Sequence, residues 1–213
     1  MAHHPICSTL YWLGGSPCSG KSTIAELLAD RYNLHYYNCD HAFARHQQAS
    51  DPAAHPTLHR LATLSSDEIW LVPVTEQVER EIAIYREEFS LIVADLEALP
   101  TERPILAEGA ALLPELIAQS PASSGRSAWV VPTSAFQQHH YAQRTWVADV
   151  LKTCSDPDQA FANWMARDIT FATYVTQTAE QLGLPVLQVD GTHTVVDNAA
   201  WVATQLGLTH DSL

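Results

Sequence analysis

The chain has 213 residues, 46% of them hydrophobic and 16% charged, which suits one folded α/β domain with an inserted lobe and excludes a disordered protein. Its formal charge of -13, with two lysines and nine arginines, argues against the basic face that a nucleic-acid-binding protein needs. No apolar run approaches the roughly 18 residues of a membrane-spanning helix, so we expect neither a nucleic-acid nor a membrane partner.

The N-terminal part of the chain alternates between strand and helix patterns. Thr9 to Leu13 is short, apolar and aromatic, which predicts a buried strand that ends at two glycines. Apolar residues with helical spacing follow from Lys21 onward. A second strand is predicted over Leu34 to Cys39, ending at Asp40.

The connection between the second and third strands is much longer than a normal crossover. Residues 41–73 are polar and rich in histidine and proline, which predicts irregular structure with short helices. A long helix follows, because apolar residues alternate in steps of four and three from Val74 to Leu99. We therefore expect a functional lobe over 41–103. Its histidines are expected to be solvated or to face a substrate: His41, His46, His55 and His59.

The second half continues the alternation of strands and helices, which predicts a parallel sheet covered by helices on both faces. The predicted strands are Ile105 to Ala107, followed by Glu108-Gly109, then Ala128 to Val131 and Val186 to Val189. The predicted helices are Leu112 to Gln119, Ser134 to Lys152, a long one capped by Asp156 that runs to Leu182, and Asp197 to Leu206.

A phosphate-binding motif lies between the first strand and the first helix. Residues 15–22 match the pattern G-x-x-x-x-G-K-[ST] at every fixed position, in the strand–loop–helix context that the pattern requires. Glycines let the backbone approach phosphate oxygens, and the helix N-terminus supplies positive dipoles. Lys21 is expected to reach the β and γ phosphates, Ser22 to bind Mg²⁺ and Thr23 to contact the α phosphate. The remaining loop residues also contact the nucleotide: Gly15, Ser16, Pro17, Cys18, Ser19 and Gly20.

Two other classes of phosphate-loop protein are disfavoured. A GTPase reads guanine through an N-K-x-D motif, but the only other lysine, Lys152, is followed by Thr153 and Cys154. We therefore expect ATP as the nucleotide. Asp95 follows four apolar residues, as in an acidic metal-binding strand motif. However, its neighbours Ile92, Leu96 and Leu99 belong to the helical stripe, so Asp95 is not expected to bind metal.

The chain resembles the small phosphate-loop kinases, the group of nucleoside-monophosphate, shikimate and gluconate kinases. The features that carry the resemblance are the sequence GSPCSGKST, Asp40 after strand two, the inserted lobe, Glu108-Gly109 after strand three, and V-D-G at 189–191. The segment AEGAALLPEL also resembles uncharacterised bacterial members of that superfamily. The resemblance implies a three-layer fold with a five-stranded sheet in the order 2-3-1-4-5, a lobe at 41–103 that binds the acceptor, and a lid at 144–167.

Two carboxylates are implied in catalysis by this resemblance. Asp40 would orient or deprotonate an acceptor hydroxyl, or hold Mg²⁺ through water. Alternatively, Asp40 caps a helix that starts near His41. Glu108 would contact the acceptor or Mg²⁺, with a salt-bridged loop carboxylate as the alternative.

The resemblance also implies cationic and backbone contacts. Arg144 would close over the phosphates, Arg167 would face the acceptor or the γ phosphate, and Arg86 would hold an acidic acceptor. A surface or ion-pair role is the alternative for Arg144 and Arg167, and a solvated helix face is the alternative for Arg86. The backbone at Asp190 and Gly191 would pack beside the adenine. Among the tryptophans, Trp70 is the best candidate to stack on a ligand.

These expectations favour an ATP-dependent kinase that phosphorylates a small molecule, with a hydroxyl preferred over a phosphate as acceptor. An ATP-binding regulatory protein with little transfer activity is the alternative, because cations in the lid are few. A toxin-like kinase of a sugar nucleotide is a third variant. We expect a cytoplasmic monomer or homodimer, with reduced thiols because no cysteine pair has C-x-x-C spacing.

Overall fold

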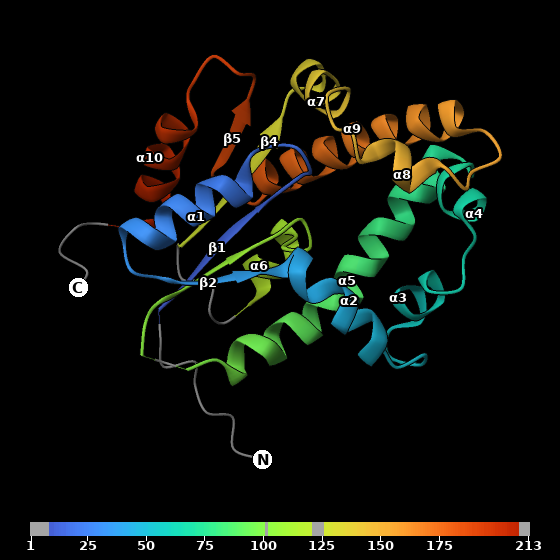
Figure 1. Ribbon diagram of the computed structural model, residues 1–213. Helices are drawn as coiled ribbons and strands as arrows, with labels where there is room; N and C mark the ends of the chain where they lie inside the picture. The colour runs from blue at the N-terminus through green and yellow to red at the C-terminus, as the bar shows by residue number, and fades with distance from the viewer. Residues whose placement is uncertain (1–8, 101, 121–125, 209–213) are drawn as a thin grey trace.

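A computed structural model describes residues 9–100, 102–120 and 126–208. Its centre is one parallel sheet with the strand order β2-β3-β1-β4-β5, as the sequence predicted (Figure 1). The strands are β1 Leu10–Gly15, β2 His35–Asn38, β3 Ile105–Glu108, β4 Ser127–Pro132 and β5 Val186–Val189.

Helices cover both faces of the sheet and build a lobe at one end of it (Figure 1). They are α1 Lys21–Arg31, α2 Cys39–Ala49, α3 Pro56–Leu61, α4 Ser66–Trp70, α5 Val74–Ala98, α6 Pro114–Gln119, α7 Ser134–Tyr141, α8 Val147–Leu151, α9 Pro157–Gln181 and α10 Val195–Leu206. None of the helices in the described part of the chain is long and apolar enough to cross a membrane.

Two hydrophobic cores lie on opposite faces of the sheet, because successive strand side chains point to opposite sides. On one face, Leu13 and Val130 pack against α1 and α10, and on the other Trp12 and Trp129 pack against α5 and α9. Both cores are closed to solvent, since Leu13 and Trp129 are fully buried. This packing fixes the carboxyl edge of the sheet, where β1 turns into the phosphate-binding loop.

The inserted lobe is more helical than the sequence pattern indicated. The prediction of irregular structure with short helices over 41–73 agrees with α3 and α4, but α2 is an eleven-residue helix that begins at Cys39, inside the predicted second strand. The Asn38 side chain caps α2 by accepting a hydrogen bond from the backbone N–H of His41. Asp40 therefore lies in the first turn of α2, and it neither ends the strand nor caps the helix.

Smaller boundary predictions also differ from the structure. The helix predicted over Ser134 to Lys152 is broken by a turn at 142–146 into α7 and α8. The segment that begins at Leu112 becomes helical only at Pro114, which favours the first position of a helix. The last helix starts at Val195, because Thr194 forms a capping box with Asp197.

Candidate functional site

The loop between β1 and α1 has the backbone of an anion-binding cradle. Cys18 and Gly20 adopt positive φ angles of 65° and 81°, which turn the chain sharply ahead of α1. Gly20 is the N-cap of α1, and no side chain caps the helix. The N–H groups of the first turn are therefore available to a phosphate, which the helix dipole also favours.

Lys21 lies at the base of this loop and is nearly buried, with 7% of its surface exposed. Its ammonium donates a hydrogen bond to the backbone carbonyl of Ser16 at 2.8 Å, which holds the charge against the loop. The hydroxyls of Ser16 and Ser19 are buried and have no hydrogen-bond partner among the described residues. The loop thus presents donors that phosphate oxygens can satisfy.

A cleft of about 930 Å³ opens over the loop and extends into the inserted lobe. Residues 17–23 form its floor at the sheet edge, and α2, α4 and α5 form the wall on the lobe side. The opposite wall comes from Tyr141, Arg144, Trp146, Trp164 and Arg167. One continuous cleft therefore joins the predicted nucleotide loop to two of the predicted acceptor residues, Asp40 and Arg167.

Ser22 and Asp40 face this cleft from two neighbouring elements and are both exposed. A hydroxyl and a carboxylate are hard oxygen donors of the kind that Mg²⁺ takes, together with the phosphates of a bound nucleotide. Among the described residues, no group of three or more His, Cys, Asp and Glu side chains could hold a metal by itself. The two residues fit a metal that is shared with a nucleotide.

Glu108 lies at the end of β3, fully buried behind the phosphate loop. Its Oε2 accepts hydrogen bonds from the Tyr36 hydroxyl at 2.8 Å and from the Asn38 amide at 3.1 Å. Burial raises the pKa of this carboxyl, while the charge of Lys21 lowers it. Glu108 is thus placed as a buried neighbour of Lys21, with no surface ion pair.

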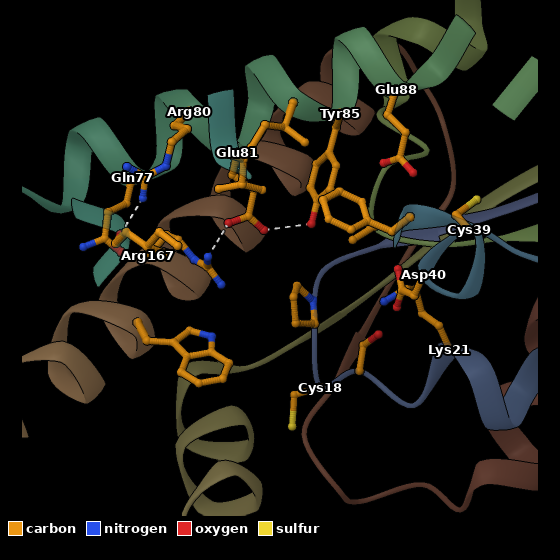
Figure 2. Close-up of a pocket in the computed structure, with 18 of the residues that line it drawn as sticks. Cys18, Lys21, Cys39, Asp40, Gln77, Arg80, Glu81, Tyr85, Glu88 and Arg167 are labelled. Atoms are coloured by element: carbon orange, nitrogen blue, oxygen red, sulfur yellow. Dashed lines mark hydrogen bonds and ion pairs between the residues drawn. The ribbon is translucent and has the colours of Figure 1, made fainter. Parts of the chain in front are cut away.

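One face of α5 projects into the cleft from the lobe. Figure 2 shows Gln77, Glu81, Tyr85 and Glu88 along this helix, with Cys18 and Lys21 on the other side of the cavity. Glu81 accepts a hydrogen bond from the Tyr85 hydroxyl at 2.8 Å. Glu88 Oε1 lies 2.8 Å from Nδ1 of His46, a buried histidine in α2.

Arg167 joins α5 to α9 deep in the cleft (Figure 2). Its Nη1 lies 2.7 Å from Glu81 Oε2, and its Nε and Nη2 donate to Asp168 Oδ1 at 2.9 and 2.6 Å. Burial alone would lower the pKa of Arg167, but the two carboxylates raise it above its ordinary value. Arg167 is thus a fixed cation whose charge is already matched within the protein.

Arg144 approaches the phosphate loop from the segment between α7 and α8. Its guanidinium lies over the ring of Tyr141, 4.6 Å from the centroid, and over Trp146 at 5.4 Å. Its Nη2 donates to Cys18 Sγ at 3.6 Å. Among the predicted cations, Arg144 is the one placed next to the loop without a carboxylate partner in the described residues.

Several predicted contact residues do not line the cleft: Glu108, described above, and Arg86, Asp190 and Gly191. Arg86 points away from it and pairs with Glu115 at 3.1 Å, which is the surface role that the sequence left open. Asp190 accepts hydrogen bonds from Thr192, and Gly191 lies against the ring of Phe136. Contact of Asp190 and Gly191 with the adenine stays a prediction.

The site contains residues that the sequence reasoning missed. Positions 77, 81, 84 and 88 follow the same alternation of four and three as the apolar stripe of α5, one position earlier. This second, partly polar stripe was a usable signal for the cleft wall.

The prediction that His46 is solvated or faces a substrate was wrong, since the ring is buried and bonds to Glu88 and Asp95 at 2.8 Å each. Asp95 lies on α5, as expected, and pairs with Arg45.

Comparisons with known proteins define the fold. No protein-family model matches the chain, and no curated protein is similar to it. A shikimate kinase from Acinetobacter baumannii, solved with shikimate, superposes with a TM-score of 0.50 at 14% identity, over 97% of this chain and 96% of that one. The structure of TT1252 from Thermus thermophilus gives 0.51 at 17% identity, over 95% and 98% of the two chains.

A gluconokinase from Sinorhizobium meliloti 1021 also matches, with a TM-score of 0.43 at 13% identity over 96% of this chain and 94% of that one. At these identities the likeness concerns the fold and leaves the acceptor open. The strand order, the phosphate loop and the helical lobe of this chain agree with that likeness in fold. The chain has the fold of the small-molecule phosphate-loop kinases.

Proposed function

We propose that the protein transfers the γ-phosphoryl group of MgATP to a hydroxyl group of a small molecule. The observation that carries the proposal is the single cleft that joins the phosphate loop to the helical lobe. A γ phosphate seated over Lys21 faces the lobe across this cleft, so an acceptor held by α5 lies in line for transfer.

In this proposal each loop residue has a separate task. Lys21 and the first-turn N–H groups of α1 neutralise the transferred phosphoryl group, and Arg144 adds charge from the opposite wall. Mg²⁺ held here with the nucleotide would draw charge from the phosphate oxygens. Ser22 and Asp40 would hold that ion, directly or through water. Alternatively, Asp40 orients or deprotonates the acceptor hydroxyl.

Consumption of ATP in the presence of a panel of sugars, nucleosides, hydroxy acids and aromatic alcohols tests the proposal. Lys21→Ala is expected to lower turnover by about 100-fold or more, because it removes a charge aimed at the transferring group. Lys152→Ala is the matched control, since Lys152 is exposed, does not line the cleft, and pairs with Asp149 on the surface of α8. Turnover that survives Lys21→Ala at the wild-type rate would contradict the assignment, as would a preference for GTP over ATP.

An ATP-binding regulatory protein with little transfer activity is the second candidate. It is favoured by the engagement of Arg167, whose charge is already matched by Glu81 and Asp168. The same assay separates the two candidates. Tight MgATP binding without turnover on any acceptor supports the regulatory protein and contradicts the kinase.

A further inference from the structure

The lobe side of the cleft offers little to an anionic acceptor. Arg167 is held between two carboxylates, as described above. Arg80 donates through its two terminal nitrogens to the backbone carbonyls of Glu68 and Ile69, at the end of α4. These two arginines are the cations that the lobe and α9 contribute to the cleft, and each already has partners.

Carboxylates, in contrast, line the same region. Asp40, Glu81 and Glu88 all border the cleft, the last two on one face of α5 (Figure 2). Glu81 is paired with Arg167 and Glu88 with the ring of His46, so Asp40 is the exposed carboxylate of the three that would repel a second carboxylate or a phosphate at short range. Hydroxyl and ammonium groups, however, can donate hydrogen bonds to these oxygens.

The remaining wall is aromatic. Trp70 and Trp164 lie with their ring centroids 4.6 Å apart, and Trp146 and Tyr141 lie 5.8 and 5.4 Å from Trp164. All four side chains border the cleft, and Phe43 borders it from α2. Tyr141 and Trp164 are buried within this cluster, so the ring surface open to a ligand belongs to the partly buried Trp70 and the exposed Trp146, and flat apolar groups pack well against it.

Two buried polar atoms on this wall have no hydrogen-bond partner among the described residues. The amide nitrogen of Gln77 donates to the carbonyls of Trp70 and Val72, each at 2.9 Å, which leaves its Oε1 as an unpaired acceptor. The indole Nε1 of Trp164 is an unpaired donor. Buried groups of this kind carry a free-energy cost, and because neither atom is exposed to the cleft, a ligand with its own donor and acceptor removes that cost only after the side chains that cover these atoms move.

We infer that the acceptor is an uncharged or positively charged alcohol that carries an aromatic ring and an amide-like or hydroxyl polar group. The inference rests on the proposed function, and it specifies the chemical class of the substrate. The ring packs against the partly exposed Trp70, and the polar group pairs with Gln77 Oε1 and Trp164 Nε1. The alcohol faces Asp40 and the phosphate loop. Its oxygen attacks the γ phosphorus, the bond to ADP breaks, and the hydroxyl proton passes to a carboxylate.

Three probes of similar size test the charge preference: N-benzoylethanolamine, which is neutral, phenylalaninol, which is cationic, and phenyllactate, which is anionic. Each is titrated by calorimetry into protein saturated with Mg²⁺ and an ATP analogue that cannot transfer its phosphoryl group. We expect the neutral and cationic probes to bind at least about tenfold more tightly than phenyllactate. Equal or tighter binding of phenyllactate, or no binding of any probe at millimolar concentration, would overturn the inference.

A ring-free analogue, N-acetylethanolamine, tests the aromatic wall. Trp70 is only partly buried, so Trp70→Ala is expected to fold. This variant should bind N-benzoylethanolamine about tenfold more weakly and N-acetylethanolamine as the wild type does. An unchanged preference for the benzoyl compound would place its ring elsewhere and overturn the inference.

Trp164→Phe tests the unpaired donor, because it keeps a ring and removes Nε1. We expect about a fivefold loss of affinity for N-benzoylethanolamine. Trp12→Phe is the matched control, since Trp12 is also buried with an unpaired Nε1 but lies in the core beside the sheet. Equal effects of the two changes would contradict the role of Trp164.

The affinity for MgATP is measured first on every variant, which keeps the two proposals separate. Failure of the wild type to bind MgATP counts against the proposed function. With MgATP bound normally, the order of affinities among the probes counts for or against the acceptor class alone.

Discussion

Gly15 ends β1 at the point where the chain leaves the sheet and enters the phosphate loop. Its φ angle is 137°, and a Cβ atom there would lie 1.9 Å from the carbonyl oxygen of Val130, on the neighbouring strand. A side chain at this position therefore strains the backbone and forces β1 and β4 apart. The geometry explains why the loop motif needs glycine here, apart from any contact with phosphate.

Gly15→Ala is expected to lower the free energy of unfolding by roughly 3 kcal/mol or more. Gly183→Ala is the matched control, because Gly183 also has a positive φ but no atom within 4 Å of the added Cβ. That variant should lose only about 1 kcal/mol. Urea unfolding of both proteins measures the difference, and equal losses would contradict the steric argument.

Glu108 gives a prediction about pH. Its pKa is raised from an ordinary value of 4.5, mainly by burial. At pH values between 4.5 and the raised pKa, the native state binds more protons at this carboxyl than the unfolded state does. The contribution of Glu108 to stability is therefore most favourable at acidic pH and is lost as the pH rises through the raised pKa.

Glu108→Gln removes this ionisation and keeps an oxygen that can accept the bonds from Tyr36 and Asn38. The stability of the variant, relative to wild type, should increase from mildly acidic to neutral pH. Chemical unfolding at the two pH values provides the measurement. A relative stability that falls as the pH rises would show that the sign is wrong.

At the scale of elements, α5 and α9 are joined by the ion pairs of Arg167. Glu81 and Asp168 are both buried, so removal of the arginine leaves two carboxylates in the interior without their cation. Breaking a buried pair from one side is far more costly than losing an exposed pair. These contacts therefore hold the wall of the cleft in place.

Arg167→Met should lower the free energy of unfolding by about 3–5 kcal/mol. Arg86→Met serves for comparison, because the Arg86 side chain is 54% exposed and its ion pair with Glu115 is worth less than about 1 kcal/mol. Both changes keep a long apolar side chain on the helix. A small effect of Arg167→Met would mean that the pair does not hold α5 against α9.

The sequence predicted the strands and the long helices well, because their signals are local. The apolar pattern of β1, the stripe of α5 and the Asp156 cap of α9 each operate within a few residues. The start of α2 was harder to predict, since it depends on a cap by Asn38 within an apparent strand. The break at 142–146 was also missed, because α8 is stabilised by packing on α9 more than by its own sequence.

The parts of the candidate site that have local sequence signals were predictable, and the parts built from distant residues were not. Gly15 to Ser22 form a contiguous motif, and Asp40 follows an apolar strand pattern although it lies in the first turn of α2. The structure places Lys21, Ser22 and Asp40 around one cleft. The buried ring of His46 between Glu88 and Asp95 joins residues that lie more than 40 positions apart. Such pairs have no signal in a single sequence, because each partner reads as an ordinary polar residue on a helix.

For the whole molecule, ligand binding should stabilise the native state through the cleft. At a MgATP concentration about 100 times the dissociation constant, the expected gain is about 2.7 kcal/mol. Differential scanning calorimetry would show this gain as a higher unfolding temperature in the wild type. Lys21→Ala should show little or no increase at the same concentration, and an equal increase in both proteins would place the nucleotide elsewhere.

Phosphorus NMR of the protein with MgATP and a panel of aromatic alcohols tests the central claim most directly. We predict that the γ-phosphate signal of ATP disappears as ADP and a new phosphate monoester appear, and that Lys21→Ala abolishes this change. ATP that stays intact with every alcohol while calorimetry shows it bound, or inorganic phosphate as the only product, would contradict transfer to a hydroxyl.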